Sequence, residues 1–246
     1  MKRAVGFITL ICVLATTPVS ADIYGGQVLY NRISGHYAGN GGEFTLSEDP
    51  AGGGLNLDLS AYISGVTKDL SGSTGVPSFQ TFCLEMGEFI ASPMEVVVNT
   101  TFIDEGTGVV SGSGSHAILG GKAYGDNLDP YTAYLYTQFA TGVLSNYDYG
   151  AGRAVSAGQL QNAIWYLEGE TSSLLSTQAS DWVTEAQNSG WTGIGSVRVL
   201  NSWVPGHIGD DRYRKQDQLY LTPIPASVIL GLLGLSVVGV KLRKYA

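Results

Sequence analysis

The sequence predicts an α+β fold: a β-rich extracellular domain with a helical insert, flanked by an N-terminal signal peptide and a short C-terminal hydrophobic sorting helix. Three observations predict it. Gly, Ser, Thr and Asn separate short stretches rich in Val, Ile, Tyr and Phe over much of the chain, which is typical of strands joined by turns. Between residues 129 and 188, apolar residues recur at helical spacing instead. Both ends carry apolar runs beside basic residues.

The first 21 residues have the three parts of a secretory signal peptide. Lys2 and Arg3 form a basic start, an apolar run covers 4–15, and small residues at the end include Ala21. We expect cleavage after Ala21. The alternative is an anchor that is kept, although the run is shorter than the roughly 20 residues of a spanning helix.

The segment 223–246 has the pattern of a tail directed to the membrane. Pro223-Ile224-Pro225 precedes an apolar run over 226–240, and the basic residues Lys241, Arg243 and Lys244 follow it. As a helix, this run is roughly 22 Å long, against a hydrocarbon core of about 30 Å. We expect it to enter the membrane at least transiently, with its basic end on the cytoplasmic side.

This tail resembles the PEP-CTERM sorting signal of exopolysaccharide-producing diderm bacteria, and it departs from that signal at Ile224, where Glu is usual. The resemblance implies export to the cell surface or the extracellular matrix. It also implies an exosortase-type enzyme as the partner that processes the tail. A permanent single-pass anchor is the alternative.

The segment 22–222 between these ends is long enough for one domain with a real core. It is also acidic. Five of the 13 Lys+Arg lie in the end segments and none of the 21 Asp+Glu do, so 8 basic residues face 21 acidic ones, a net charge of −13. Such a surface argues against nucleic acid as a partner.

Strand-like runs and helix signals follow one another along this domain. Leu55-Asn56-Leu57-Asp58-Leu59 alternates strictly, which predicts a strand with one buried face. Asp129 before Pro130 predicts the start of a first helix. Ser156, with Gln159 three residues later, predicts the start of a second helix. Strands are expected over 23–34, 42–47, 55–63, 79–86, 94–103, 196–204 and 218–221, and a third helix over 173–188.

Cys83 is the cysteine that remains once the leader with Cys12 is removed. A single cysteine in an exported protein is buried and inert, paired with another chain, or reactive. Alternation along the strand 79–86 puts Phe79, Cys83 and Glu85 on one face. Gln161 lies near the expected start of the second helix, whose positive end favours a thiolate. A Cys and a Gln on facing rigid elements, walled from water by Phe79 and Trp165, can form a thioester when sulfur displaces ammonia from the carboxamide.

Phe82-Cys83-Leu84 and Gln161-Asn162-Ala163-Ile164-Trp165 resemble the two motifs of the thioester (TQXA-type) domains of bacterial surface adhesins. Leu160 stands where that family has Thr. The resemblance implies that Cys83 and Gln161 form the thioester, with Trp165 and Phe82 as pocket walls. It also implies covalent adhesion, in which a lysine amine of a surface partner attacks the bond. One such event per molecule is not turnover, so we expect neither an enzyme nor a cofactor.

Other interpretations compete with the thioester. A buried strand cysteine is often an inert core residue, which would leave a non-catalytic structural component of the exopolysaccharide or biofilm matrix. An intermolecular disulfide is a third state. A Cys–His hydrolase would need a base within reach of a cysteine at an exposed turn or helix start. The three histidines, His36, His116 and His207, do not have the spacing of zinc ligands. The run Gly209-Asp210-Asp211, with Asp217, does not have the spacing of a calcium-binding loop.

Overall fold

The structure is a computed structural model that describes residues 26–39, 41–70, 77–99 and 128–223. The signal cleavage site at Ala21 lies outside these ranges, and Pro223 is the last residue of the sorting signal inside them. Within the described ranges, no helix has the length and apolar character needed to cross a membrane. The remaining residues of the sorting signal also lie outside the described ranges: Ile224, Pro225, Lys241, Arg243 and Lys244.

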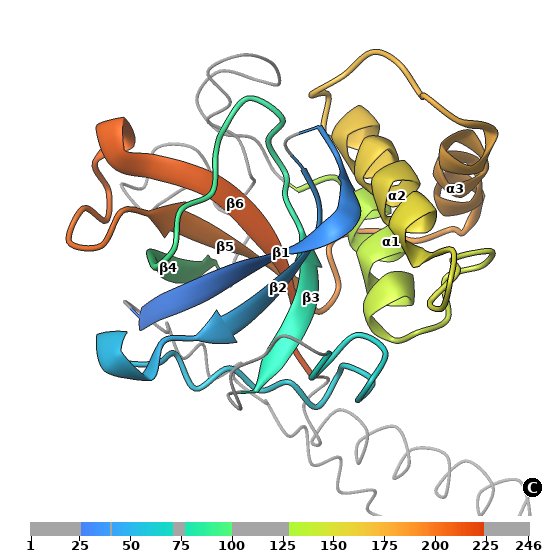
Figure 1. The fold of residues 1–246 in the computed structure, drawn as a ribbon. Coiled ribbons are helices and arrows are strands. Elements are labelled where there is room, and N and C mark those ends of the chain that lie inside the picture. Colours follow the sequence, from blue (N-terminus) through green and yellow to red (C-terminus); the bar gives the residue numbers. More distant parts are fainter. Residues whose placement is uncertain (1–25, 40, 71–76, 100–127, 224–246) are drawn as a thin grey trace, which may run out of the picture.

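Within the described residues, six antiparallel strands form one sheet in the order β3-β2-β1-β4-β5-β6 (Figure 1). An isolated bridge between Cys83, just after β3, and Gln218 of β6 joins the two outer strands, so the sheet is nearly closed. The strands are β1 (Gly26–Ala38), β2 (Gly41–Glu48), β3 (Ser78–Phe82), β4 (Met94–Asn99), β5 (Val197–Trp203) and β6 (Arg214–Leu221).

One face of the sheet is the interior of this nearly closed barrel. Strand register pairs Tyr30 with Leu46 and Leu46 with Phe79, so these side chains share a face. The Phe79 ring on this face lies 5.5 Å from the ring of Tyr220, centroid to centroid, although the two residues come from opposite edges of the sheet. The bridge at Cys83 continues the same alternation, which puts the thiol at one end of the interior.

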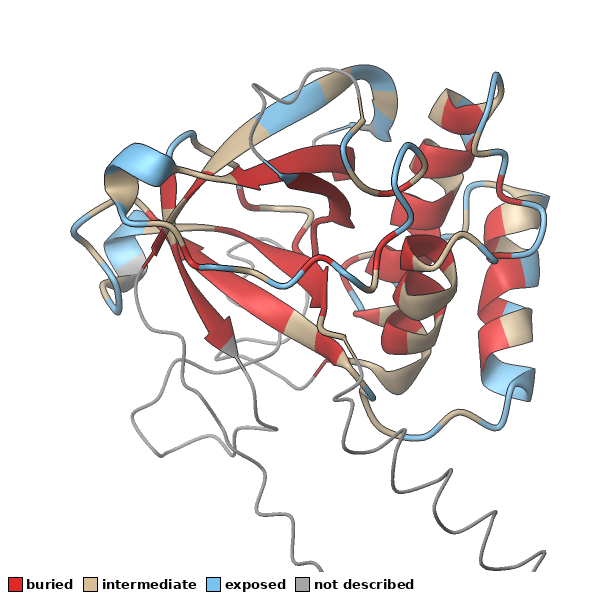
Figure 2. Ribbon diagram, turned by 90° about the horizontal axis from the view of Figure 1, so that it is seen from below, coloured by how far each residue is buried: buried red, intermediate tan, exposed pale blue. Residues whose placement is uncertain are grey.

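In the described ranges, three helices lie beside the barrel: two of them pack against the strands, and the third, α3, packs on the outer side of the other two (Figures 1 and 2). They are α1 (Pro130–Ala140), α2 (Arg153–Leu167) and α3 (Thr177–Asn188). The first begins as predicted, because the Asp129 side chain accepts a hydrogen bond from the backbone N–H of Tyr131. Phe139 of α1 packs edge-on against Phe82 of β3 at 4.9 Å between centroids. A β-rich α+β class is therefore confirmed.

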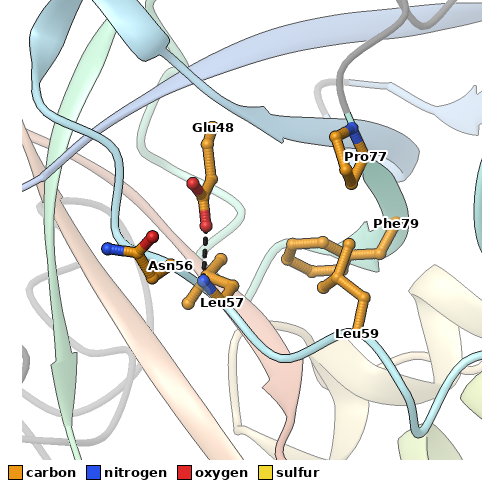
Figure 3. A pocket seen from close by; sticks show the side chains of 6 residues that line it. All are labelled: Glu48, Asn56, Leu57, Leu59, Pro77 and Phe79. Carbon is orange, nitrogen blue, oxygen red and sulfur yellow. Dashed lines mark hydrogen bonds between the residues drawn. The ribbon is translucent and has the colours of Figure 1, made fainter.

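The prediction of a strand over 55–63 is wrong. Leu55 and Leu59 are buried, as the alternation implies, but the segment is a loop laid along the sheet rather than a strand in it. Its Leu57 N–H donates to the carboxylate of Glu48 instead of to a neighbouring strand. A pocket of about 300 Å³ lies between this loop and β3, with Glu48 and Phe79 in its lining (Figure 3).

Two other boundaries differ in ways that affect the site. The cysteine strand ends at Phe82, and the chain bends at Leu84. Helix α2 begins at Arg153, after Gly152, rather than at Ser156. Gln161 therefore lies in the middle of α2, away from the positive potential that acts within the first turn of a helix.

Candidate thioester site

Cys83 and Gln161, which lie 78 residues apart in sequence, are in direct contact. Cys83 Sγ donates to Gln161 Oε1 at 3.2 Å, and Gln161 Nε2 donates to the backbone oxygen of Cys83 at 2.8 Å. Both residues are fully buried. The side chain and backbone of one cysteine thus contact both ends of the carboxamide and hold the sulfur beside the group that it would attack.

A third contact fixes which way the carboxamide points. The backbone N–H of Gly42 donates to Gln161 Oε1 at 2.8 Å. Only the amide oxygen accepts such a bond, and only the NH₂ group donates to a carbonyl, so the network assigns both atoms. An N–H on this oxygen polarises the carbonyl. It would also stabilise the negative charge that develops there when a nucleophile attacks.

Only glycine fits at position 42. Its φ is +151°, and a Cβ there would lie 2.2 Å from the backbone oxygen of His36. The neighbouring Gly41 is equally constrained by packing. A Cβ on Gly41 would lie 2.2 Å from Cζ2 of Trp165 and 2.6 Å from Cys83 Sγ. The backbone of β2 therefore approaches the sulfur and the indole ring as closely as a glycine permits.

Aromatic and apolar side chains surround the thiol, as a water-sensitive bond requires. Phe44, Cys83 and Trp165 form one buried cluster, with Tyr30 partly buried against it. Met86 and Ile90 cover the cluster from the segment after β3. Of the three expected walls, the structure brings Trp165 to the sulfur.

Phe79 and Phe82 belong to the main core instead of the Cys83 cluster, which corrects the expectation that they form its walls. Phe79 shares the face of Cys83 but lies four residues away, about 13 Å along an extended chain. Phe82 points to the opposite face, against α1. Phe44 and Tyr30 supply the aromatic rings at the sulfur, and nothing in the Cys or Gln motif identifies them.

One ridge of α2 carries the site. Arg153, Gln161 and Trp165 are spaced by multiples of four and so lie on the same side of the helix. Arg153 makes a bidentate ion pair with Glu43, with Nε 3.0 Å from each carboxylate oxygen and Nη2 2.5 Å from Oε1. Glu43 directly follows Gly42, so this pair fixes α2 against the strand that supplies the N–H donor.

Both carboxylate oxygens of Glu43 accept hydrogen bonds. Glu43 is completely buried, and Tyr147 also donates to its Oε2 at 2.8 Å. Burial raises the pKa of Glu43, but the neighbouring His36 and the hydrogen bonds from Arg153 outweigh that effect and bring the pKa below its usual value. Sequence reasoning missed this pair, because single charged residues 110 positions apart carry no pattern.

The environment of the Cys83 thiol disfavours the thiolate. Burial raises the pKa of Cys83, and the nearby charge of Glu85 raises it further. Because α2 begins at Arg153 and Gln161 lies in its middle, the expectation that a helix N-terminus favours the thiolate is wrong for this fold. A thiol with a raised pKa needs a proton acceptor before it can attack a carboxamide.

The alternative sites find no support in the described residues. Asp210 pairs with Arg212 at 2.7 Å, and both Asp217 carboxylate oxygens accept hydrogen bonds, from Asn201 and Ser202. No group of three or more His, Cys, Asp or Glu side chains in the described ranges could hold a metal ion. The ring of His207 stacks on Tyr213 at 3.7 Å between centroids. His36 neighbours Glu43, and His116 lies outside the described residues.

Leu160, where the adhesin motif has Thr, is fully buried in the main core. Comparison of the chain with protein-family models, with curated proteins and with solved structures finds no match. The functional argument therefore rests on the two short motifs and on the geometry that joins them.

Proposed function

We propose that this chain is an exported surface or matrix protein of a diderm bacterium that attaches covalently through an internal thioester between Cys83 and Gln161. One observation carries the proposal. The Cys83 thiol contacts the Gln161 carboxamide at 3.2 Å, with a Gly42 N–H already on the carbonyl oxygen, inside a buried aromatic cluster.

The chemistry has two steps. In the first, Cys83 Sγ bonds to the Gln161 side-chain carbonyl carbon, the carbon–nitrogen bond breaks, and the thiol proton leaves with the nitrogen as ammonia. In the second, a primary amine such as a lysine side chain attacks the same carbon. An amide then forms and the Cys83 thiol is released. The chain is consumed once, so it is a covalent adhesin rather than an enzyme.

Export and placement rest on the sequence patterns at the two ends. The leader to Ala21 would direct export, and the segment from Pro223 to the basic end would be handled by an exosortase-type enzyme at the membrane. The excess of acidic residues over 22–222 suits an amine-bearing cationic partner. A matrix polysaccharide is the partner in the structural alternative, in which Cys83 is inert.

The test is capture of a biotinylated primary amine by the purified chain. We expect wild type to incorporate the probe at Gln161, and Gln161→Ala and Cys83→Ala to incorporate none. Gln159→Ala, on the same helix and partly exposed, is the matched control and should label like wild type. Absence of labelling in wild type, or equal labelling of wild type and Gln161→Ala, would contradict the proposal and favour the structural matrix component.

A further inference from the structure

Glu85 lies two residues after Cys83, at the seam that closes the barrel. The backbone N–H of Asp217 donates to Glu85 Oε2 at 2.8 Å, and Gln216 Nε2 donates to the backbone oxygen of Glu85 at 2.5 Å. Leu84 N–H donates to the backbone oxygen of Asp217 at 3.1 Å. These bonds hold both the chain and the carboxyl group of Glu85 in place beside the cysteine.

One oxygen of this carboxyl group is unused. Glu85 is fully buried, and its Oε1 has no hydrogen-bond partner among the residues that the structure describes. The buried hydroxyl of Tyr30, which packs on the Cys83 cluster, likewise has none within those ranges. A buried polar atom without a partner is costly, and such atoms are often found at functional sites.

Two other buried carboxyl groups near the site accept hydrogen bonds. Both oxygens of Glu43 accept hydrogen bonds from Arg153, and its Oε2 accepts another from Tyr147. Glu170 Oε2 accepts from the backbone N–H of Met86 at 3.1 Å. Glu85 therefore combines a spare, buried oxygen with a position two residues after Cys83, on the same short segment at the seam.

We propose that Glu85 is the proton carrier for the chemistry at Cys83, an inference that rests on the proposed thioester function. During formation, the carboxylate takes the proton from Cys83 Sγ as the sulfur–carbon bond forms. It passes that proton to the Gln161 nitrogen as the carbon–nitrogen bond breaks, so ammonia leaves and Glu85 is ionised again. During capture, Glu85 takes the surplus proton of the attacking amine and returns it to the departing sulfur of Cys83.

The pKa of Glu85 determines the pH range in which its carboxylate can accept a proton. Burial raises its pKa well above the usual value, and the negative charges of Asp217 and Glu88 raise it further. The ionised form that accepts a proton therefore becomes populated only as the pH rises. The groups that act on this cluster are Tyr30 from β1, Cys83 and Glu88 from the segment after β3, Glu170 after α2, and Asp217, Arg214 and Lys215 from β6.

The experiment follows methylamine incorporation by intact mass from pH 5 to 9, with each rate divided by the concentration of unprotonated amine. We expect this normalised rate to rise with pH in wild type. In Glu85→Gln, which keeps the shape but carries no proton, we expect it to fall at least tenfold and to become flat, since general acid–base groups contribute about 10²–10⁴ in rate. The control is Glu88→Gln, which removes a nearby buried carboxyl group whose charge raises the pKa of Glu85. Its normalised rate should still rise with pH, over a lower pH range than in wild type, and should reach a plateau within threefold of the wild-type plateau.

The outcomes separate this inference from the proposed function. The ammonia deficit in mass is measured before amine is added, so a wild-type chain without the deficit refutes the thioester itself. If Glu85→Gln folds but lacks the ammonia deficit, and Glu88→Gln has it, the result supports a role for Glu85 in forming the thioester. A Glu85→Gln chain that forms the bond and reacts within threefold of Glu88→Gln overturns the inference.

A variant that keeps a carboxyl group covers the case in which Glu85→Gln does not fold. Glu85→Asp shortens the side chain by one carbon but can still carry a proton. We expect it to form the thioester and to capture methylamine more slowly, with a shifted pH profile. An unchanged rate and profile in Glu85→Asp would also overturn the role of Glu85.

Discussion

Replacing Gly41 by alanine tests whether the close packing around the thiol is required for the bond. The new Cβ would lie 2.2 Å from Cζ2 of Trp165 and 2.6 Å from Cys83 Sγ, and ordinary contacts begin near 3.4 Å. The ring or the sulfur must therefore move by about 1 Å, and overpacking of this kind costs about 1–3 kcal/mol. For a domain of this size, that corresponds to a fall in Tm of roughly 2–4 °C per kcal/mol.

A movement of that size also breaks the reactive geometry. We expect Gly41→Ala to lose most of the ammonia deficit in mass and most methylamine capture. Gly39→Ala is the matched control, since nothing lies within 4 Å of its new Cβ while its φ of +57° imposes a strain of roughly 1–2 kcal/mol. A Gly41→Ala chain with a full deficit and a wild-type capture rate would refute the idea that close packing at this glycine is needed.

Three further predictions follow from the site and its surroundings. Arg153→Met leaves the Glu43 carboxylate buried without its cation, which should lower the free energy of unfolding by about 3–5 kcal/mol. Urea titration should show this loss, and adding Glu43→Gln should restore part of it. An unchanged urea midpoint in Arg153→Met would contradict the prediction. Gln161→Glu offers no ammonia to displace, so its mass should equal the sequence mass, and a deficit would be unexplained. Burial raises the pKa of Asp217 to about 6 and that of Glu88 to about 8, so each holds its proton more tightly when folded. Their contribution to stability is complete below the unfolded values near pH 4 and is lost as the pH rises through about 6 and 8. Urea titrations should show stability falling between pH 5 and 8, less steeply in Glu88→Gln, and a rise would contradict the assignment.

The sequence was most informative where side chains leave a pattern. The Asp129-Pro130 pair marked the start of α1, and the two short motifs identified Cys83 and Gln161 as a pair that the structure brings into contact. The strand prediction over 55–63 failed for a physical reason. Alternating burial needs one buried side but no partner strand, so a loop lying on the sheet shows the same period.

The parts that could not be predicted depend on the backbone or on distant pairing. Gly42 acts through its N–H, which every residue except proline has, so nothing distinguishes it in a glycine-rich chain. The Glu43–Arg153 pair and the aromatic wall from Phe44 depend on how β2 packs against α2. The unused oxygen of Glu85 is visible only once every neighbouring hydrogen bond has been assigned.

The most direct test of the thioester is the intact mass of the purified chain before and after treatment with methylamine. The geometry at Cys83 and Gln161 predicts a mass below that of the sequence by one ammonia molecule, and methylamine should then add its full mass at Gln161 and expose the Cys83 thiol to alkylation. A mass equal to that of the sequence, with Cys83 alkylated only after unfolding and no methylamine added, would contradict it.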